Sequence, residues 1–116
     1  MVVRLNLSDA EVDRIFRALA DATRRDIIAR VLGGEPISVS ALAERYDMSF
    51  AAVQKHVAVL EGAGLVSKET SGRERLVRGN PERLAKARAL LVQLENLWRA
   101  RFSQLDAVLA ETDSKE

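Results

Sequence analysis

The fold of this chain is decided by one stretch, residues 48–78, whose sequence is MSFAAVQKHVAVLEGAGLVSKETSGRERLVR. Ser49 is a residue type that caps helix N-termini, and Gly62-Ala63-Gly64 is typical of a helix end. Apolar residues recur between them at helical spacing and form the expected buried stripe: Ala52, Val53, Val57 and Leu60. The first half of the stretch therefore predicts a helix from Phe50 to about Gly62.

The second half of the stretch predicts a β-hairpin. Residues 65–69 and 75–78 have strand character, and residues 70–73 are typical of the turn between them. Arg73 and Arg75 flank Glu74 near this turn, so the expected hairpin tip is basic.

Two helices are predicted near the N-terminus. The first covers residues 8–20, where Ser8 and Glu11 match a capping box. The second covers residues 22–32, with Asp21 as its N-cap and a Gly-Gly pair at its end.

A third helix is predicted directly before the deciding stretch. Pro36 favours a short extended entry, and either Ser38 or Ser40 is a suitable N-cap. The helix is expected to run through Leu42 and Ala43 to Tyr46, followed by a turn.

The last predicted helix is long for so small a chain. It begins at Pro81 and runs to about Thr112, which corresponds to roughly 45 Å. Its apolar residues follow a 3-4 spacing that only Arg101 interrupts. Such a helix carries more apolar surface than this chain can cover, so we expect it to pair with a second copy. The alternative is that it folds back onto the first helix of the same chain.

The expected architecture is mainly α with a small β-hairpin, in a single domain over residues 1–112 followed by a frayed polar tail at 113–116. The dimer interface is expected to join apolar residues of the first and last helices: Val12, Ile15, Phe16, Leu91, Leu94, Trp98, Phe102 and Leu105.

Composition narrows the class of protein. The net charge is +1, but residues 45–88 hold nine Lys and Arg against five Asp and Glu, which favours a polyanion partner. Cysteine is absent, so no disulfide or thiolate site is expected. No apolar run reaches the roughly 20 residues of a membrane span, and no signal-peptide pattern is present, which predicts a cytoplasmic protein without a membrane partner.

An enzyme is not expected. The chain has one histidine, no glycine-rich phosphate loop and no recognisable catalytic triad or carboxylate pair.

Three segments, in order and at consistent spacing, carry a family resemblance. The first is Leu-Ala-Asp-Ala-Thr-Arg-Arg at residues 19–25, and the second combines residues 37–42 with Met48-Ser49 and residues 52–57. The third combines residues 64–66 with Gly-Arg-Glu-Arg at 72–75. The chain resembles the ArsR-type winged helix-turn-helix repressors over roughly residues 13–109.

The resemblance implies a homodimer that binds operator DNA and represses transcription. Metal-sensing members carry Cys-Val-Cys where this chain has Ser38-Val39-Ser40, and others use histidine in the last helix, which here contains none. The chain is therefore similar to the subgroup without the metal motif, which includes autorepressors. Neither a metal nor another cofactor is expected, and the effector is unknown.

The resemblance and the residue chemistry together predict DNA contacts from the helix at residues 50–62. Gln54 can pair with adenine, and Lys55 can donate to guanine or phosphate. His56 can contact phosphate or form a hydrogen bond within the helix-turn-helix. The remaining expected contacts of this helix are Ser49, which also caps it, Phe50, which can pack on a thymine methyl or cover the turn, and Ala51.

Arginines outside this helix complete the predicted site. Arg73 and Arg75 suit insertion into a narrow minor groove. Arg24 can reach the DNA backbone or form an internal salt bridge with Asp21 or Asp26.

Two rival hypotheses remain open from the sequence. One is a winged helix that docks a protein instead of DNA, which a weak salt dependence of binding would favour. The other is a ligand-responsive sensor of the same family, with a small molecule or an oxygen-ligated metal at the dimer interface.

Overall fold

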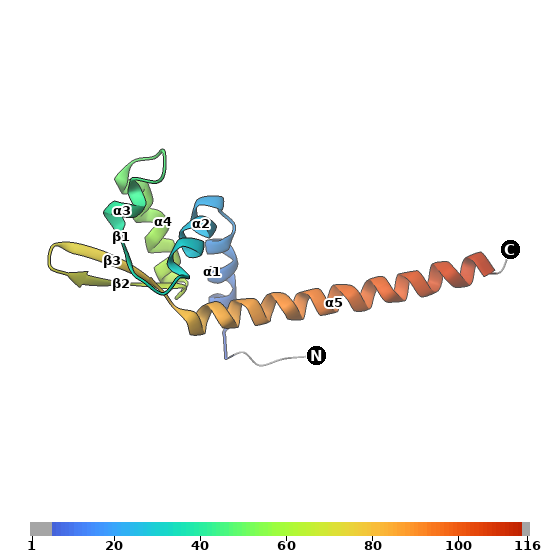
Figure 1. The fold of residues 1–116 in the computed structure, drawn as a ribbon. Helices are drawn as coiled ribbons and strands as arrows, with labels where there is room; N and C mark the ends of the chain where they lie inside the picture. The colour runs from blue at the N-terminus through green and yellow to red at the C-terminus, as the bar shows by residue number, and fades with distance from the viewer. Residues whose placement is uncertain (1–5, 115–116) are drawn as a thin grey trace. The chain divides into compact units, whose positions relative to one another are not determined.

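The computed structural model describes residues 6–114, and Figure 1 shows their helices and strands. Asn6–Ala85 forms one compact unit, and the part of α5 from Lys86 onward belongs to a second. The elements follow in the order α1 (Asp9–Leu19), α2 (Ala22–Val31), β1 (Ile37–Ser38), α3 (Val39–Ala43), α4 (Phe50–Gly62), β2 (Val66–Ser71), β3 (Glu74–Gly79) and α5 (Pro81–Ser114).

Side-chain caps fix the starts of the first four helices. Ser8 and Glu11 form the complete capping box predicted for α1, with N···O distances of 3.2 and 3.1 Å. Asp21 caps α2 and Ser49 caps α4, each by accepting the backbone N–H three residues on. Of the two candidates for α3, Ser38 is the cap. Each cap satisfies one of the N–H groups that a helix leaves unpaired at its start.

A glycine in the left-handed conformation ends α4. Gly64 has φ +76°, and the Leu65 N–H bonds the Leu60 carbonyl at 3.0 Å while the Gly64 N–H bonds the Glu61 carbonyl at 2.9 Å. This pair of bonds is a Schellman motif, which needs a residue that tolerates positive φ. It turns the chain sharply from α4 into β2.

The sheet has three strands, one more than the hairpin predicted from the sequence. Its order is β1-β3-β2, and all pairs are antiparallel. The additional strand is the extended entry to α3, where Ile37 lies opposite Val77. Strand β1 has only two residues, too few to show the alternation of apolar and polar side chains that predicts a strand. Its pairing also depends on a distant part of the chain.

The core of the first unit is built from apolar side chains alone among the described residues. Val53, Val57 and Leu60 of α4 are fully buried, as predicted, whereas Ala52 is only partly buried. The helix packs on α1, α2, α3 and β2. Its position is therefore fixed by contacts from every side except its exposed face.

The expectation that Ile15 belongs to a dimer interface is wrong. Its side chain is 1 % exposed within the single chain, so it has no surface left for a partner. Val12 and Phe16, on the same helix, are partly exposed. Helical spacing placed all three residues on one face, but the inner edge of that face is in the core.

Two predicted helix ends differ from the structure. Tyr46 lies beyond the end of α3, and its hydroxyl donates to the Asp26 carboxylate at 2.6 Å. Helix α5 continues to Ser114, past the expected end at Thr112 and into the expected tail. The last two residues of that tail lie outside the described residues. No helix within residues 6–114 is long and apolar enough to cross a membrane.

An ion pair joins the start of α1 to the first turn of α5. Arg83 Nη1 lies 2.7 Å from Glu11 Oε2, and this hydrogen bond, with a further one from the Ser8 backbone, lowers the pKa of Glu11 to about 2. A carboxyl with a depressed pKa stabilises the fold above its unfolded value of 4.5. That contribution is lost as the pH falls from 4.5 toward 2.

We therefore expect Glu11→Gln to flatten the pH dependence of stability in this acidic window. Urea unfolding followed by circular dichroism at several pH values between neutrality and 2.5 measures it. Glu44→Gln, at an exposed position, is the control and should keep the wild-type profile. Equal loss of stability in acid for the wild type, Glu11→Gln and Glu44→Gln would contradict a role for the Glu11–Arg83 pair.

Candidate nucleic-acid interface

The exposed face of α4 carries most of the residues predicted to bind DNA. Ser49, Phe50, Ala51, Gln54 and Lys55 are all exposed, and 46 % of Phe50 is accessible. They lie at the N-terminal half of the helix, whose backbone N–H groups and dipole favour a negative partner. The amide of Gln54 and the ammonium of Lys55 make no hydrogen bond or ion pair within residues 6–114.

Ser49 has one hydroxyl for two tasks that are compatible. Its oxygen accepts the Ala52 N–H at 3.1 Å, which starts the helix. A hydroxyl also has a proton to donate, and the cap does not use it. The residue can therefore cap α4 and donate to a phosphate at the same time.

The hairpin of β2 and β3 extends away from the helices as a wing (Figure 1). Ser71 and Glu74 are paired, which leaves Gly72-Arg73 as a two-residue turn. Gly72 has φ +61° whereas Arg73 does not have positive φ, the pattern of a type II′ turn. Such a turn matches the twist of the strands and holds Arg73 at the tip.

Arginines of the hairpin divide into two kinds. Arg78, near the base, pairs with Glu69 across the strands at 3.0 Å and donates to the Gly34 carbonyl at 3.3 Å. Arg73 and Arg75 are exposed, and neither pairs with a carboxylate in the part of the chain that the structure describes. The base of the wing is thus tied by charge, while the tip leaves two cations available.

A shallow hollow of about 220 Å³ joins the wing to the exposed face of α4. Phe50 and Gln54 of the helix line it together with Arg73 and Arg75 of the wing. The remaining lining residues are Val39, Ser40 and Glu74. Four of the predicted DNA-binding residues therefore line one hollow. They come from α4 and from the wing, which are about twenty residues apart in the sequence.

Ser40 was not predicted to belong to this surface. The sequence suggested it only as a helix cap, a role that Ser38 fills. Its exposed side chain lies in α3 beside Phe50 and Gln54 at the hollow. The available signal was its place two residues after the cap, on the first turn of the helix that precedes α4.

The guanidinium of Arg24 is bonded within the chain, but not in either of the salt bridges, with Asp21 or Asp26, considered from the sequence. Its guanidinium donates to two carbonyls at the end of α1, Ala18 at 2.8 Å and Arg17 at 2.9 Å, and contacts His56 Nδ1 at 3.2 Å. One side chain thus connects α1, α2 and α4. These contacts hold the start of α2 against both neighbouring helices.

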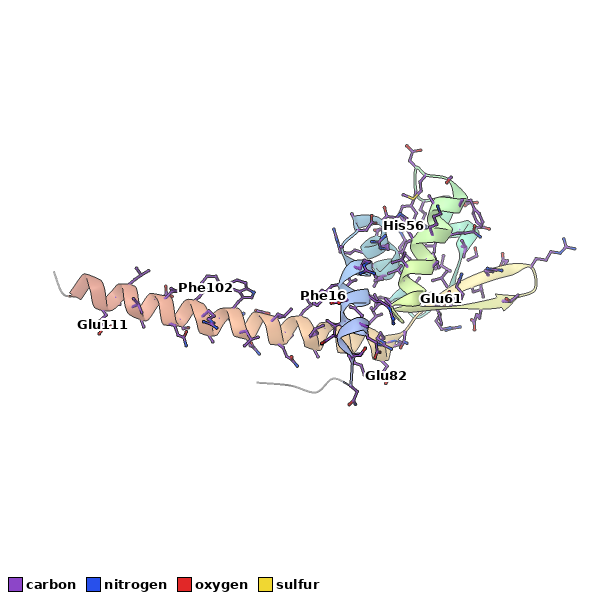
Figure 2. All side chains as sticks on the ribbon, turned by 180° about the vertical axis from the view of Figure 1, so that it is seen from behind. Phe16, His56, Glu61, Glu82, Phe102 and Glu111 are labelled. Atoms are coloured by element: carbon purple, nitrogen blue, oxygen red, sulfur yellow. The ribbon has the colours of Figure 1, made fainter. Side chains whose placement is uncertain are left out.

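His56 lies on α4 at the side that faces α2 (Figure 2), with 20 % of its side chain exposed. Because a guanidinium can only donate, Nδ1 accepts from Arg24, and the ring proton of the neutral imidazole is on Nε2. Asp21 Oδ1 lies 3.9 Å from the same Nδ1. This hydrogen bond leads to α2 and not to a residue within the helix-turn-helix, where the sequence analysis had placed the internal alternative.

Two further contacts hold α4 and the wing in place. Tyr46, in the turn before α4, donates to Asp26, and this bond together with that from Arg30 lowers the pKa of the Asp26 carboxyl. Lys68 of β2 lies 3.5 Å from Glu61 of α4. The first contact fixes the turn to α2, and the second fixes the wing to the helix. Within residues 6–114 no three His, Asp or Glu side chains are grouped so as to hold a metal ion.

The arrangement defines the class of protein. A short helix, a turn and a second helix with one exposed face, followed by a basic hairpin beside that face, make a winged helix-turn-helix, a fold of DNA-binding proteins. Residues 19–69 match the family model described as a helix-turn-helix domain.

Known proteins with this fold specify the family. The HTH-type transcriptional regulator Rv2034 of Mycobacterium tuberculosis is 40 % identical over 86 residues, which span 74 % of this chain and 77 % of that protein. The crystal structure of an ArsR family transcriptional regulator, RHA00566, is 33 % identical with a TM-score of 0.71, covering 80 % of this chain and 95 % of that one. An ArsR-like transcriptional regulator from Rhodococcus sp. RHA1 is 32 % identical with a TM-score of 0.67, covering 85 % of this chain and 92 % of that one.

The chain belongs to the ArsR-type winged helix-turn-helix transcriptional regulators. The resemblance recognised from three sequence segments is thereby confirmed, and the absence of cysteine agrees with the subgroup that lacks the thiolate motif.

Proposed function

We propose that this protein is a dimeric, sequence-specific DNA-binding repressor that places α4 in the major groove and the wing on the adjacent backbone or minor groove. The observation that carries the proposal is the hollow between α4 and the wing. Gln54, Arg73 and Arg75 meet there, exposed and without partners among the described residues. Side chains left unpaired on one surface are available to a ligand, and these three suit base edges and phosphates.

On α4, contacts of different kinds have different tasks. Gln54 can form two hydrogen bonds with adenine N6 and N7, and Lys55 can donate to guanine or to phosphate. Phe50 offers an apolar ring to a thymine methyl. Ser49 and the N-terminal N–H groups bind phosphate and set the register of the helix in the groove. The base-specific part of recognition is thus assigned to Gln54, with Lys55 and Phe50 in support.

The wing supplies affinity more than specificity. A narrow A·T-rich minor groove concentrates negative potential and attracts arginine. Arg73 is the second residue of a two-residue type II′ turn between paired strands, so the hairpin already presents it at the tip. Less conformational entropy is therefore lost when the tip engages DNA.

A second copy makes the proposed regulator symmetric. Nine large apolar side chains of α5 are exposed by 39–62 %, more apolar surface than a monomer usually shows. Two α4 helices related by a two-fold axis would reach successive major grooves about 34 Å apart, which predicts an imperfect palindrome. A dimer bound over a promoter would block polymerase. We place this protein in the cytoplasm.

Fluorescence anisotropy with a labelled duplex from the chain's own upstream region tests the proposal. We expect binding in which log K falls steeply with log salt, by about 0.9 for each phosphate contact. Selection from random duplexes should return a site with two-fold symmetry. A shuffled duplex of equal length is the control for non-specific binding.

Binding that does not depend on salt, or no binding to upstream or selected duplexes, would overturn the assignment. Binding that does not depend on salt would favour a winged helix that docks a protein. Contact with an apolar groove releases no counterions, so its affinity changes little with salt.

A further inference from the structure

We propose that a groove between α1 and the last turn of α4 binds a small organic carboxylate. The carboxyl group is held by the guanidinium groups of Arg14 and Arg17, and the hydrocarbon part lies over Gly62 and against Val59. This site is separate from the DNA-facing surface. It also differs from the dimer interface, where a small molecule was considered from the sequence.

Two adjoining hollows form the groove. The larger, of about 360 Å³, reaches from the start of α1 to the end of α4 and the first turn of α5. The smaller, of about 230 Å³, continues along α1 to Arg17 and Val59. Arg14, Gly62 and Ala63 line both hollows, so the groove is continuous past them. Pockets for small ligands typically hold roughly 300–1,000 Å³, and the larger hollow is within that range.

Contacts between three helices form the walls of the groove. Helix α1 packs directly on α4, whose last turn carries Glu61 (Figure 2). Arg83 of α5 closes the far end, because its side chain lies over Gly64, where a Cβ would be 2.9 Å from Nε. The same guanidinium pairs with Glu11 of α1 at 2.7 Å. The groove is therefore a feature of the packed unit Asn6–Ala85 and not of one flexible side chain.

The charges that remain unpaired in the groove are positive. Of its two carboxylates, Glu11 is held by the α5 arginine, and Glu61 lies 3.5 Å from Lys68. Arg14 and Arg17 are exposed, and their guanidinium groups make no hydrogen bond or ion pair with any residue from 6 to 114. The groove therefore favours an anion.

The spacing of the two free arginines suits a carboxylate. Residues three apart are neighbours on a helix surface, where two like charges repel. An anion between Arg14 and Arg17 removes this repulsion, and a guanidinium can donate two parallel N–H bonds to one carboxylate. Val12 and Phe16, expected at the dimer interface, are each two residues from Arg14, roughly 200° around the helix. The dimer expected from the sequence therefore leaves Arg14 uncovered.

Gly62 keeps the floor of the groove open. Its φ is not positive, and the glycine that ends α4 is Gly64, so the backbone does not require glycine at position 62. Packing does not require it either, since a Cβ there would have no heavy atom within 4 Å. Glycine destabilises a helix relative to alanine. Its evident effect here is to let a ligand approach the α4 backbone beside Arg14.

An apolar surface next to the cations specifies the kind of anion. Val59, one turn before the end of α4, is 38 % exposed and lines the smaller hollow together with Arg17. A bare inorganic anion leaves this surface in water, whereas a hydrocarbon chain covers it. A monocarboxylate with a short aliphatic chain therefore fits both halves of the groove.

The groove and the DNA-facing surface are at opposite ends of α4. Ser49, Phe50 and Gln54 belong to the N-terminal half of the helix, and the groove begins at Val59. A carboxylate and a DNA duplex can therefore be bound at the same time. Binding of the carboxylate does not depend on the proposed function.

Nuclear magnetic resonance of the ¹⁵N-labelled full chain, titrated with hexanoate, tests the site. The chain has six glycines, so the amide signal of Gly62 is readily followed. We expect saturable shifts centred on Gly62, Ala63 and Arg14. Hexanamide, which lacks the charge, and inorganic phosphate, which lacks the chain, should each bind at least about tenfold more weakly.

Two variants change the groove, each with a matched control. Arg14→Gln should weaken hexanoate binding about tenfold, because a charge-assisted hydrogen bond is lost. Arg45→Gln, which removes an exposed arginine outside the groove, should not. Gly62→Leu should abolish the binding by filling the floor. Gly33→Leu, at another glycine without positive φ or a neighbour within 4 Å of a Cβ, should keep it.

Thermal unfolding followed by circular dichroism shows that each variant is folded before it is titrated. Hexanoate shifts that do not saturate, or that are unchanged in folded Arg14→Gln or Gly62→Leu, would overturn the site. Equal affinity for hexanamide would overturn the recognition of a carboxylate, and equal affinity for phosphate would overturn the apolar contact. DNA binding is measured separately, so loss of this site leaves the proposed repressor untouched.

Discussion

Replacing Arg73 and Arg75 together by alanine should weaken binding to every duplex, operator or not, by at least tenfold at physiological salt. Both cations are exposed and unpaired within residues 6–114, so their removal takes positive charge from the DNA-facing surface without breaking an internal bond. A dimer loses them twice. The salt dependence should become shallower, by about 1 in slope for each phosphate that is no longer neutralised.

Gln54→Ala is the matched comparison, because it changes the same hollow from the α4 side. It should relax the preference at one position in each half-site and leave the salt slope unchanged. Anisotropy titrations at several salt concentrations, on the operator and on duplexes altered at single positions, measure both effects. A double arginine variant with wild-type slope would remove the wing from the proposed interface.

A large loss of stability is expected from Leu60→Ala. The side chain is fully buried, and its carbonyl accepts the Leu65 N–H of the motif that ends α4. Deleting three buried carbons costs about 2–5 kcal/mol, from lost transfer free energy and from the cavity that remains. That is a large part of the roughly 5–15 kcal/mol that stabilises a typical domain.

Val59→Ala, at the neighbouring position with 38 % exposure, is the control and should change the free energy of unfolding by about 0.5 kcal/mol or less. Urea unfolding of the two variants at neutral pH measures the difference. Similar midpoints for both would show that α4 is not anchored through Leu60.

Local patterns allowed the helix starts to be predicted almost residue by residue. Ser8, Asp21 and Ser49 each bond a backbone group three residues away, so the sequence contains both partners. The same holds for the end of α4, where Gly64 is part of the motif. Interactions between residues only a few positions apart can be predicted from the sequence before the fold is known.

What the sequence could not show depends on residues far apart in the chain. Strand β1 exists because Ile37 pairs with Val77, and Tyr46 leaves α3 in a conformation that bonds Asp26. Ile15 and Phe16 are neighbours on one helix, yet packing buries the first and leaves the second partly exposed. Helical periodicity defines a face but not how deeply its edges are covered.

The candidate site was predicted in part. Exposed residues of α4 and the wing lie where amphipathic spacing placed them, and the hollow brings them together. Arg24 was assigned to DNA because it is a cation near a helix start. The carbonyl groups that it satisfies belong to the preceding helix, and only the fold shows that they lie within its reach.

The hydrogen bond between Arg24 and His56 has a consequence for the imidazole ring. Because a guanidinium can only donate, it occupies the lone pair of Nδ1. The Nε2–H donor lies on the opposite side of the ring and points away from Arg24. A phosphate oxygen that reached Nε2 would therefore meet a donor whose direction is already set by the contact with Arg24.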